Sequence, residues 1–161
     1  MNPTVFLKSE LLENGVMRVD VMFQNPPKNF AGVAFDLVIP GQWSLQKTVN
    51  GGLFKQEDVL VLVEKYLLKP KNMNHSALVF GLSVKSAELK KYQQLKDGVV
   101  VSFEIKTAQQ KLNFDFKNTV LSVFDGTRRD LKNVVWKSGG FEMDAAKPAN
   151  DQFLQQQFFS Q

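Results

Sequence analysis

Three segments of this chain alternate between apolar residues and other residues, and this period of two limits the possible folds more than any other feature. The apolar phases are Met17, Val19, Val21 and Phe23 in the first segment, Val33, Phe35, Leu37 and Ile39 in the second, and Val99, Val101, Phe103 and Ile105 in the third. Residues two apart in a β-strand share one face of the sheet. Because the other phase is mostly polar, we expect sheets with one buried face, as in a two-layer antiparallel sandwich.

Turn-forming residues separate the strand patterns. Asn14-Gly15, Asp97-Gly98 and Asp125-Gly126 tolerate the backbone angles of tight hairpin turns. Between such breaks we predict strands at residues 4–12, 16–24, 31–39, 77–84, 99–107, 111–116, 119–124 and 131–137, with a short strand around Trp43 and Leu45. Gly139-Gly140 is interpreted as a kink or bulge, after which residues 141–143 close a sheet edge.

Two segments depart from this alternation. Residues 58–68 are apolar in both phases, which fits a strand covered on both faces or the start of a helix. The β-branched valines favour the strand. Residues 86–95 predict a short helix that Ser86 can cap, with apolar side chains at three-residue spacing: Leu89, Tyr92 and Leu95.

The composition limits the class of protein. The length of 161 residues suits one domain, and the absence of Cys excludes disulfide bonds and thiolate metal sites. The net charge of +4 comes from scattered residues that form no basic stripe, so we expect no nucleic-acid partner. No apolar run approaches the roughly 18 residues of a membrane-spanning helix. The first residues lack the features of a signal peptide, so we expect no export signal in this chain.

The composition changes near the end of the chain. We predict one sandwich domain over residues 1–143, followed by a linker and an amphipathic tail over residues 144–161. The apolar residues of the tail are spaced for one face of a helix: Phe153, Leu154, Phe158 and Phe159. The tail either docks on the sandwich, binds a partner, which includes self-association through residues 151–161, or is disordered.

Few residues offer catalytic chemistry, and we do not expect an enzyme. The single histidine, His75, lies in a loop sequence, and residues 81–85 lack the second glycine of a nucleophile elbow. Asp20, Asp36 and Glu104 fall on outward strand phases and are interpreted as solvated charges. The sequence contains no phosphate-binding loop, dinucleotide fingerprint or calcium loop. We therefore expect no catalytic residue, no cofactor and no metal site.

The order and spacing of four stretches resemble a cohesin domain, the receptor module of bacterial cellulosomes and of many non-cellulosomal surface proteins. These stretches are Phe30–Pro40 followed by Trp43-Ser44-Leu45, Leu78–Ser83, Lys96–Lys106, and the segment from Leu112 through Asp125-Gly126 and Val134-Val135 to Phe141. The likeness covers residues 4–143. It implies an all-β, two-sheet antiparallel jelly-roll sandwich of about nine strands, with the short helix near residues 86–95.

The resemblance also implies a function and a site. Cohesins bind a dockerin, a small paired calcium-loop module, through one sheet face made by the third, fifth, sixth and eighth strands. Here these strands match residues 31–39, 58–68, 77–84 and 111–117. The implied partner-binding face is Ala34, Asp36, Val38, Leu60, Leu62, Glu64, Tyr66, Val79, Gly81, Ser83, Asn113, Asp115 and Lys117. A module of this kind is expected to be extracellular or on the cell envelope.

Alternative interpretations stay open at this point. An exposed apolar patch rimmed by charge indicates a protein partner. The alternative is that a loop or the segment 153–159 covers these residues. A carbohydrate-binding module needs a row of exposed aromatic rings, for which Tyr66 is a candidate, whereas Trp43 is expected in the core and Trp136 near a strand end. A structural subunit of a surface or secretion assembly would use the tail at residues 151–161.

Overall fold

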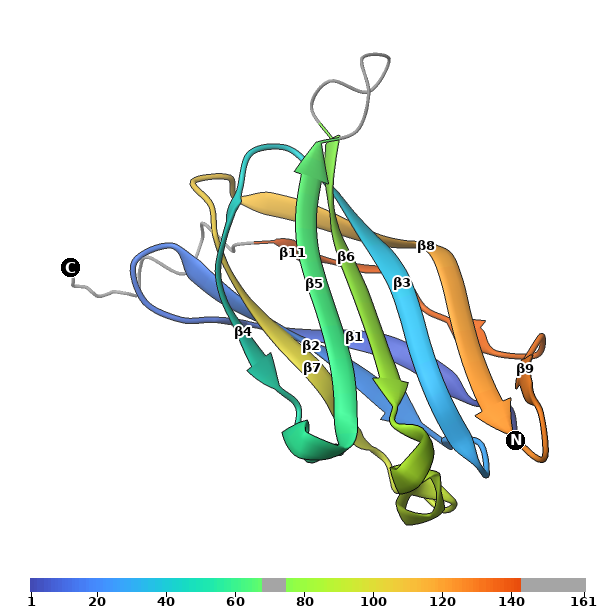
Figure 1. Ribbon diagram of the computed structural model, residues 1–161. Helices are drawn as coiled ribbons and strands as arrows, with labels where there is room; N and C mark the ends of the chain where they lie inside the picture. The colour runs from blue at the N-terminus through green and yellow to red at the C-terminus, as the bar shows by residue number, and fades with distance from the viewer. Residues whose placement is uncertain (68–74, 143–161) are drawn as a thin grey trace.

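The structure is a computed structural model that describes residues 1–67 and 75–142. It is an all-β sandwich of two sheets, mostly antiparallel, as the sequence predicted (Figure 1). No helix in the described ranges is long and apolar enough to cross a membrane. The predicted boundary between a domain at 1–143 and a tail at 144–161 falls at the end of the described residues, so the tail lies outside them.

The first sheet has five strands in the order β10-β1-β2-β7-β4. Its strands are β1 (Thr4–Leu11), β2 (Val16–Gln24), β4 (Ser44–Asn50), β7 (Gly98–Lys106) and β10 (Val135–Trp136). β10 runs parallel to β1, whereas the other pairs are antiparallel. The sandwich is therefore not purely antiparallel.

The second sheet has the order β11-β8-β3-β6-β5, and β9 pairs with β8 beside this path. Its strands are β3 (Phe30–Pro40), β5 (Val59–Leu67), β6 (His75–Val84), β8 (Lys111–Phe124), β9 (Arg128–Asp130) and β11 (Gly139–Glu142). β5 forms one edge of this sheet and β11 the other. The prediction that Phe141 closes a sheet edge is thus confirmed.

The core lies between the two sheets and is rich in phenylalanine. Phe35 of β3 stacks on Phe80 of β6 with ring centroids 5.2 Å apart, and Phe80 meets Phe103 of the opposite sheet at 6.1 Å. The predicted inward phases of the first two alternating segments are all buried: Met17, Val19, Val21, Phe23, Val33, Phe35, Leu37 and Ile39. Alternation between apolar and polar residues therefore identified the core face of β2 and β3 correctly.

Two bulges shift the phase of strands that the sequence treated as regular. Met22 pairs with Val99 while Val21 pairs with Val101, so Val100 is the extra residue of β7. Val100 is consequently buried and Val99 only half-buried, the reverse of the predicted phase. In β8, Asn118 adopts a positive φ of 50° at a second shift, and the predicted strands 111–116 and 119–124 are one continuous strand.

The segment predicted as one strand at residues 131–137 forms a strand only at Val135–Trp136, which is β10. β9 pairs with β8 of the second sheet, whereas β10 pairs with β1 of the first, because the chain crosses from one sheet to the other between them. The described residues therefore hold eleven strands, compared with the nine or so expected. Gly139 and Gly140 lie within β11 in regular register, so the predicted kink or bulge there is wrong.

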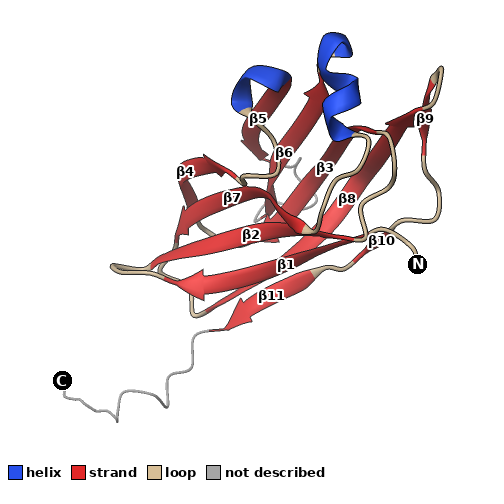
Figure 2. Cartoon of the chain, turned by 90° about the horizontal axis from the view of Figure 1, so that it is seen from below, coloured by secondary structure: helices blue, strands red, loops and turns tan. Residues whose placement is uncertain are grey.

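Figure 2 shows two short helical segments at one end of the sandwich, η1 (Gln56–Asp58) before β5 and η3 (Ser86–Tyr92) after β6. Both are 3-10 helices. The predicted cap is wrong, because Lys85 is the N-cap of η3 and no side chain caps it. Tyr92 is buried, and Leu89 and Leu95 pack against the core, as their spacing predicted.

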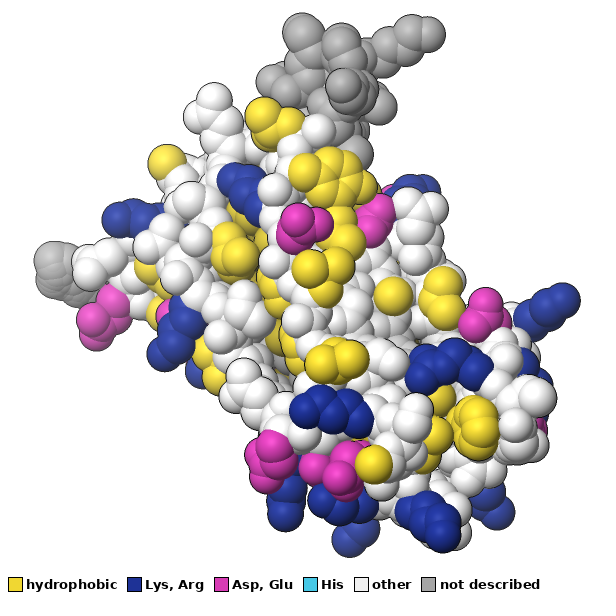
Figure 3. Space-filling model, in the orientation of Figure 1, with side chains coloured by type: hydrophobic (Ala, Val, Ile, Leu, Met, Phe, Trp, Pro, Cys, Tyr) yellow, Lys and Arg dark blue, Asp and Glu magenta, His cyan; other side chains and the backbone are white. Residues whose placement is uncertain are grey.

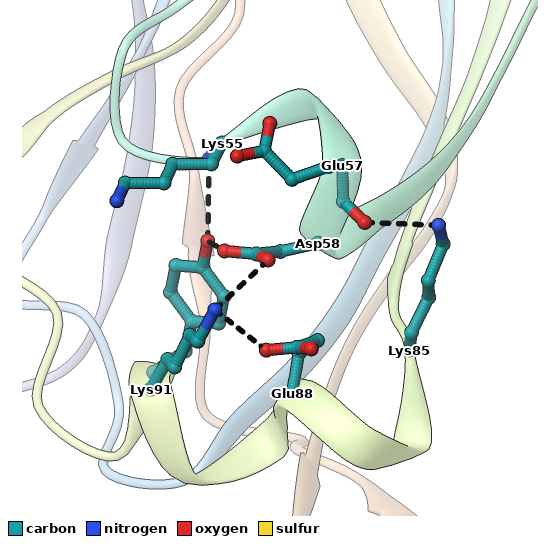
Figure 4. Close-up of polar contacts among 7 residues, drawn as sticks. Lys55, Glu57, Asp58, Lys85, Glu88 and Lys91 are labelled. Atoms are coloured by element: carbon teal, nitrogen blue, oxygen red, sulfur yellow. Dashed lines mark hydrogen bonds and ion pairs between the residues drawn. The ribbon is translucent and has the colours of Figure 1, made fainter.

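A cluster of polar side chains joins the two short helices (Figure 4). The buried carboxylate of Asp58 accepts a hydrogen bond from the Tyr92 hydroxyl at 2.7 Å and another from Lys91 Nζ at 3.2 Å. Lys91 also pairs with Glu88 at 2.8 Å, and Lys85 Nζ donates to the carbonyl oxygen of Glu57 at 2.9 Å. The bond from Tyr92 holds the pKa of Asp58 below its ordinary value.

We expect Tyr92→Phe to lower the free energy of unfolding at neutral pH by about 1.5–3 kcal/mol, because it removes a hydrogen bond to an ionised group. A carboxyl group whose pKa is lowered by folding stabilises the protein above its unfolded-state pKa and loses this effect as the pH falls through the folded-state value. The difference in the free energy of unfolding between wild type and Tyr92→Phe should therefore have its full size above pH 3.8, the ordinary pKa of Asp58. This difference should become smaller as the pH falls below that value. Urea denaturation at several pH values measures this, and a difference that stays constant into acid would contradict the assignment.

Candidate protein-binding face

The second sheet has an outer face, defined here as the solvent side of β8, β3, β6 and β5. Residues paired directly across these strands share a face, and the register gives four rows. These rows are Ser122-Gly32-Ser83-Leu60, Val120-Ala34-Gly81-Leu62, Lys117-Asp36-Val79-Glu64 and Asp115-Val38-Ala77-Tyr66. Asn113 precedes Asp115 by two residues on β8, so the structure brings all thirteen residues of the predicted face together on one surface.

β5 supplies most of the exposed apolar surface of the outer face. Leu60 is 62% exposed, Leu62 54% and Tyr66 39%. Figure 3 shows yellow side chains gathered over β5 and its neighbours, with acidic and basic groups around them. Within the predicted segment 58–68, Val59–Leu67 form a strand, but the interpretation that both of its faces are covered is wrong. The strand is a sheet edge, and even inward-phase Val61 is 49% exposed.

Small residues make a hollow in the middle of this face. Ala34 and Gly81 lie at its centre, and Leu60, Leu62 and Val120 stand around it in a depression of about 390 Å³. A Cβ atom built on Gly81 would have no neighbour within 4 Å, so the space above this residue is open. The hollow is of a size and lining that accept an apolar side chain from a partner.

A basic group closes one end of the hollow. Arg128 reaches from β9 across β8 and β3, and its Nη2 donates to Ser83 Oγ at 3.2 Å. Its Nη1 donates to Ser122 Oγ at 3.3 Å. A Cβ atom on Gly32 would lie 3.1 Å from Nη1, so the glycine at this position makes room for the guanidinium group.

Acidic groups lie toward the other end. Asp36 Oδ2 accepts hydrogen bonds from Tyr66 Oη at 3.1 Å and from Asn118 Nδ2 at 2.8 Å. Burial, and secondarily the bond to Asp36, raises the pKa of Tyr66. Glu64 occupies the same row as Asp36 and contacts no cation within 4 Å among the described residues.

Asp115 is held in place on the same face. Its Oδ1 atom accepts a hydrogen bond from Ser138 Oγ at 2.6 Å, and its Oδ2 atom lies 3.3 Å from Lys117 Nζ. The bond from Ser138 is the main cause of a lowered pKa of Asp115.

The sequence interpretation missed several residues of the outer face. Val120 and Ser122 were not predicted because the bulge at Asn118 moves β8 from odd-numbered to even-numbered outward residues. The apolar pattern contains the signal, since the buried phase is even up to Phe116 and odd from Leu121. Gly32 and Arg128 were also missed.

The outer face of the first sheet has a different character. Arg18 pairs there with Glu10 at 2.9 Å and with Asp20 at 3.4 Å. Asp20 therefore lies on an outward phase as predicted, but it is partly shielded and also accepts a bond from Ser102. On the outer face defined above, by contrast, Arg128 and Glu64 have no oppositely charged side chain within 4 Å among the described residues.

The described residues show no arrangement for catalysis. No group of three or more His, Cys, Asp or Glu residues in the described ranges is placed to hold a metal ion. Ser83 lies within β6, and its hydroxyl group accepts from Arg128 rather than facing a base. His75 begins β6, so its predicted position in a loop is wrong.

Trp43 belongs to the core, as expected, and the half-buried Trp136 packs against it. Trp43 is buried, and its Nε1 donates to the carbonyl oxygen of Ile39 at 3.0 Å. The ring of Trp136 lies 5.3 Å from that of Phe116. On the outer face Tyr66 is the one aromatic residue in the four rows, and its hydroxyl is bonded to Asp36. A row of stacked sugar-binding rings is therefore not formed by the described part of this face.

Comparison with solved structures finds the same architecture in cohesin domains. A non-cellulosomal cohesin from the hyperthermophilic archaeon Archaeoglobus fulgidus matches with a TM-score of 0.63 and 14% identity, over 94% of this chain and 97% of that one. A type II cohesin domain from the cellulosome of Acetivibrio cellulolyticus matches with a TM-score of 0.63 and 13% identity, over 92% of this chain and 100% of that one.

The third cohesin of ScaC from Acetivibrio cellulolyticus, solved in complex with the ScaB dockerin, matches with a TM-score of 0.62 and 18% identity. This match covers 89% of this chain and 99% of that one. No protein-family model and no curated protein sequence matches the chain. The chain therefore has the cohesin fold, at a sequence identity that defines the architecture alone.

Proposed function

We propose that this chain is a non-catalytic protein-binding module of the cohesin kind, which docks a dockerin-like partner on the outer face of β8, β3, β6 and β5. The observation that carries the proposal is the apolar edge strand β5 beside the hollow at Gly81 and Ala34. The complex of the ScaC cohesin with a dockerin supports the choice of partner.

Exposed apolar surface on β5 favours binding of a protein partner. Leu60 and Leu62 of β5 remain more than half exposed, whereas the apolar residues of the neighbouring strand β6 are mostly buried. Apolar surface removed from water stabilises a complex by about 25 cal/mol per Å², and contiguous exposed patches of this kind typically mark protein interfaces. Asp36, Glu64 and Arg128 around the patch supply the polar rim that fixes the orientation of a partner.

Two further parts of the proposal concern the setting of the module. We place it outside the cell or on the cell envelope, where the resemblance to cohesins puts such receptors. Self-association through residues 151–161 concerns residues outside the described part of the chain, and we propose it only as a second use of the molecule.

Titration calorimetry of the full chain against the dockerin modules encoded in the same genome, with calcium present, tests the proposal. We expect one of these modules to bind. Its affinity should fall in the order wild type, Gly81→Ala, Gly81→Leu, because the added atoms fill the hollow. The loss for Gly81→Leu should be at least about tenfold. Stability should not fall, since the Cβ meets nothing within 4 Å and glycine inside a strand is itself unfavourable. The proposal is wrong if no dockerin binds, or if Gly81→Leu binds as tightly as wild type.

A further inference from the structure

Arg128 differs from the other two arginines of the chain in its electrostatic partners. Arg18 pairs with Glu10 at 2.9 Å, and Arg129 pairs with Asp125 at 3.0 Å. Arg128 contacts no carboxylate within 4 Å among the described residues, although its neighbour in sequence does. No described carboxylate therefore neutralises its charge.

The guanidinium group of Arg128 is nevertheless held in place. Its hydrogen bonds to Ser83 and Ser122 fix it over Gly32, across the row that borders the hollow. Nη1 also points at the carbonyl oxygen of Ala31, at 3.5 Å. These three contacts use three of the five N–H groups of a guanidinium, so two donors remain for a ligand. A positioned arginine with spare donors is suited to recognise a carboxylate.

We infer that the partner presents a carboxylate side chain, Asp or Glu, to Arg128, next to an apolar side chain that enters the hollow at Gly81. This inference rests on the proposed function, because it describes the partner of the same face. Arg128 is then a specificity-determining residue. It rejects partners that place a lysine or arginine at this position and accepts those that place an acid there.

The opposite end of the face limits the kind of anion. Asp36 and Glu64 lie two rows away from the row of Gly32, over which Arg128 is held. This separation is four residues along β3 or β5, or about 13 Å at the rise of a β-strand. A polyphosphate or nucleic-acid strand that reached Arg128 and continued along the face would meet these carboxylates. A single acidic side chain, with a hydrogen-bond donor of the same partner at Asp36, satisfies both ends.

A displayed library of small three-helix-bundle binders, randomised on one surface and selected on the full wild-type chain, tests the inference even where the natural partner is not in hand. Binders that lose affinity for Leu62→Asp are kept as specific for the outer face. We expect these binders to be enriched in Asp or Glu next to an apolar residue, compared with the unselected library. We expect Arg128→Glu to weaken them by about tenfold or more, and Arg128→Gln to weaken them less.

Arg129→Glu is the matched control, because it changes the net charge by the same amount at the adjacent residue. It should alter affinity by less than about twofold. Thermal unfolding of each variant establishes that it is folded. Binders of the outer face that show no acidic enrichment and bind Arg128→Glu normally would overturn the inference and leave the proposed function standing. Failure to obtain any binder sensitive to Leu62→Asp would contradict both.

Discussion

Replacement of Phe80 by alanine should lower the free energy of unfolding by about 3–5 kcal/mol, a large share of the stability of a single domain. Phe80 is 1% exposed and contacts aromatic rings of both sheets, Phe35 at 5.2 Å and Phe103 at 6.1 Å. Its removal therefore leaves a cavity where the two layers meet, and the rigid strands around it cannot move inward to fill the space.

Phe124→Ala is the matched control for this change. Phe124 carries the same side chain at the end of β8 but is 39% exposed, so its truncation should cost no more than about 1 kcal/mol. Urea denaturation of the full chain measures both values, with the slope used to verify that the unfolding transition stays comparable. Similar losses for the two variants would mean that the sheets are not packed through Phe80.

The parts of the fold that could be predicted from the sequence are those with local causes. β2 and β3 were identified almost to the residue, because one phase is uniformly apolar and a turn precedes or follows. Asn14 and Gly15 adopt positive φ angles of 58° and 73°, which these residue types accept at low cost. The residue types within and beside β2 were therefore enough to predict both this strand and the turn that precedes it.

The features that could not be predicted arise from pairing between distant strands. Val100 is buried because β7 carries one more residue than β2 at that point, and an apolar residue in either phase is consistent with the sequence. Of the predicted strand at residues 131–137 only Val135–Trp136 is extended, because pairing with β1 of the first sheet, a contact distant in sequence, decides which residues form the strand.

The residues of the outer face also fall into those that the sequence could predict and those that it could not. Its thirteen predicted residues share one surface because alternation and strand matching place them there. Arg128 could not be predicted, since it reaches the hollow only through the turn after β8 and through the space that Gly32 leaves. A side chain that crosses two strands leaves no periodic signal in the sequence.

One matched pair of substitutions can show whether the partner binds the outer face or another part of the surface. Leu62→Asp replaces an apolar side chain at the hollow by a carboxylate, which a bound partner would remove from water, and should weaken binding by about 100-fold or more. Leu11→Asp makes the same chemical change at the end of β1, on a residue that is 47% exposed compared with 54% for Leu62. Because Leu11 lies on the other sheet, its replacement should leave affinity within about twofold of wild type. Both side chains are about half exposed, so both variants should fold.

The affinity of these two variants for the same dockerin module, measured by calorimetry, is the most direct test of the claim that the second sheet carries the binding surface. We expect loss of binding for Leu62→Asp and near wild-type binding for Leu11→Asp. Equal affinities, or a loss confined to Leu11→Asp, would contradict it.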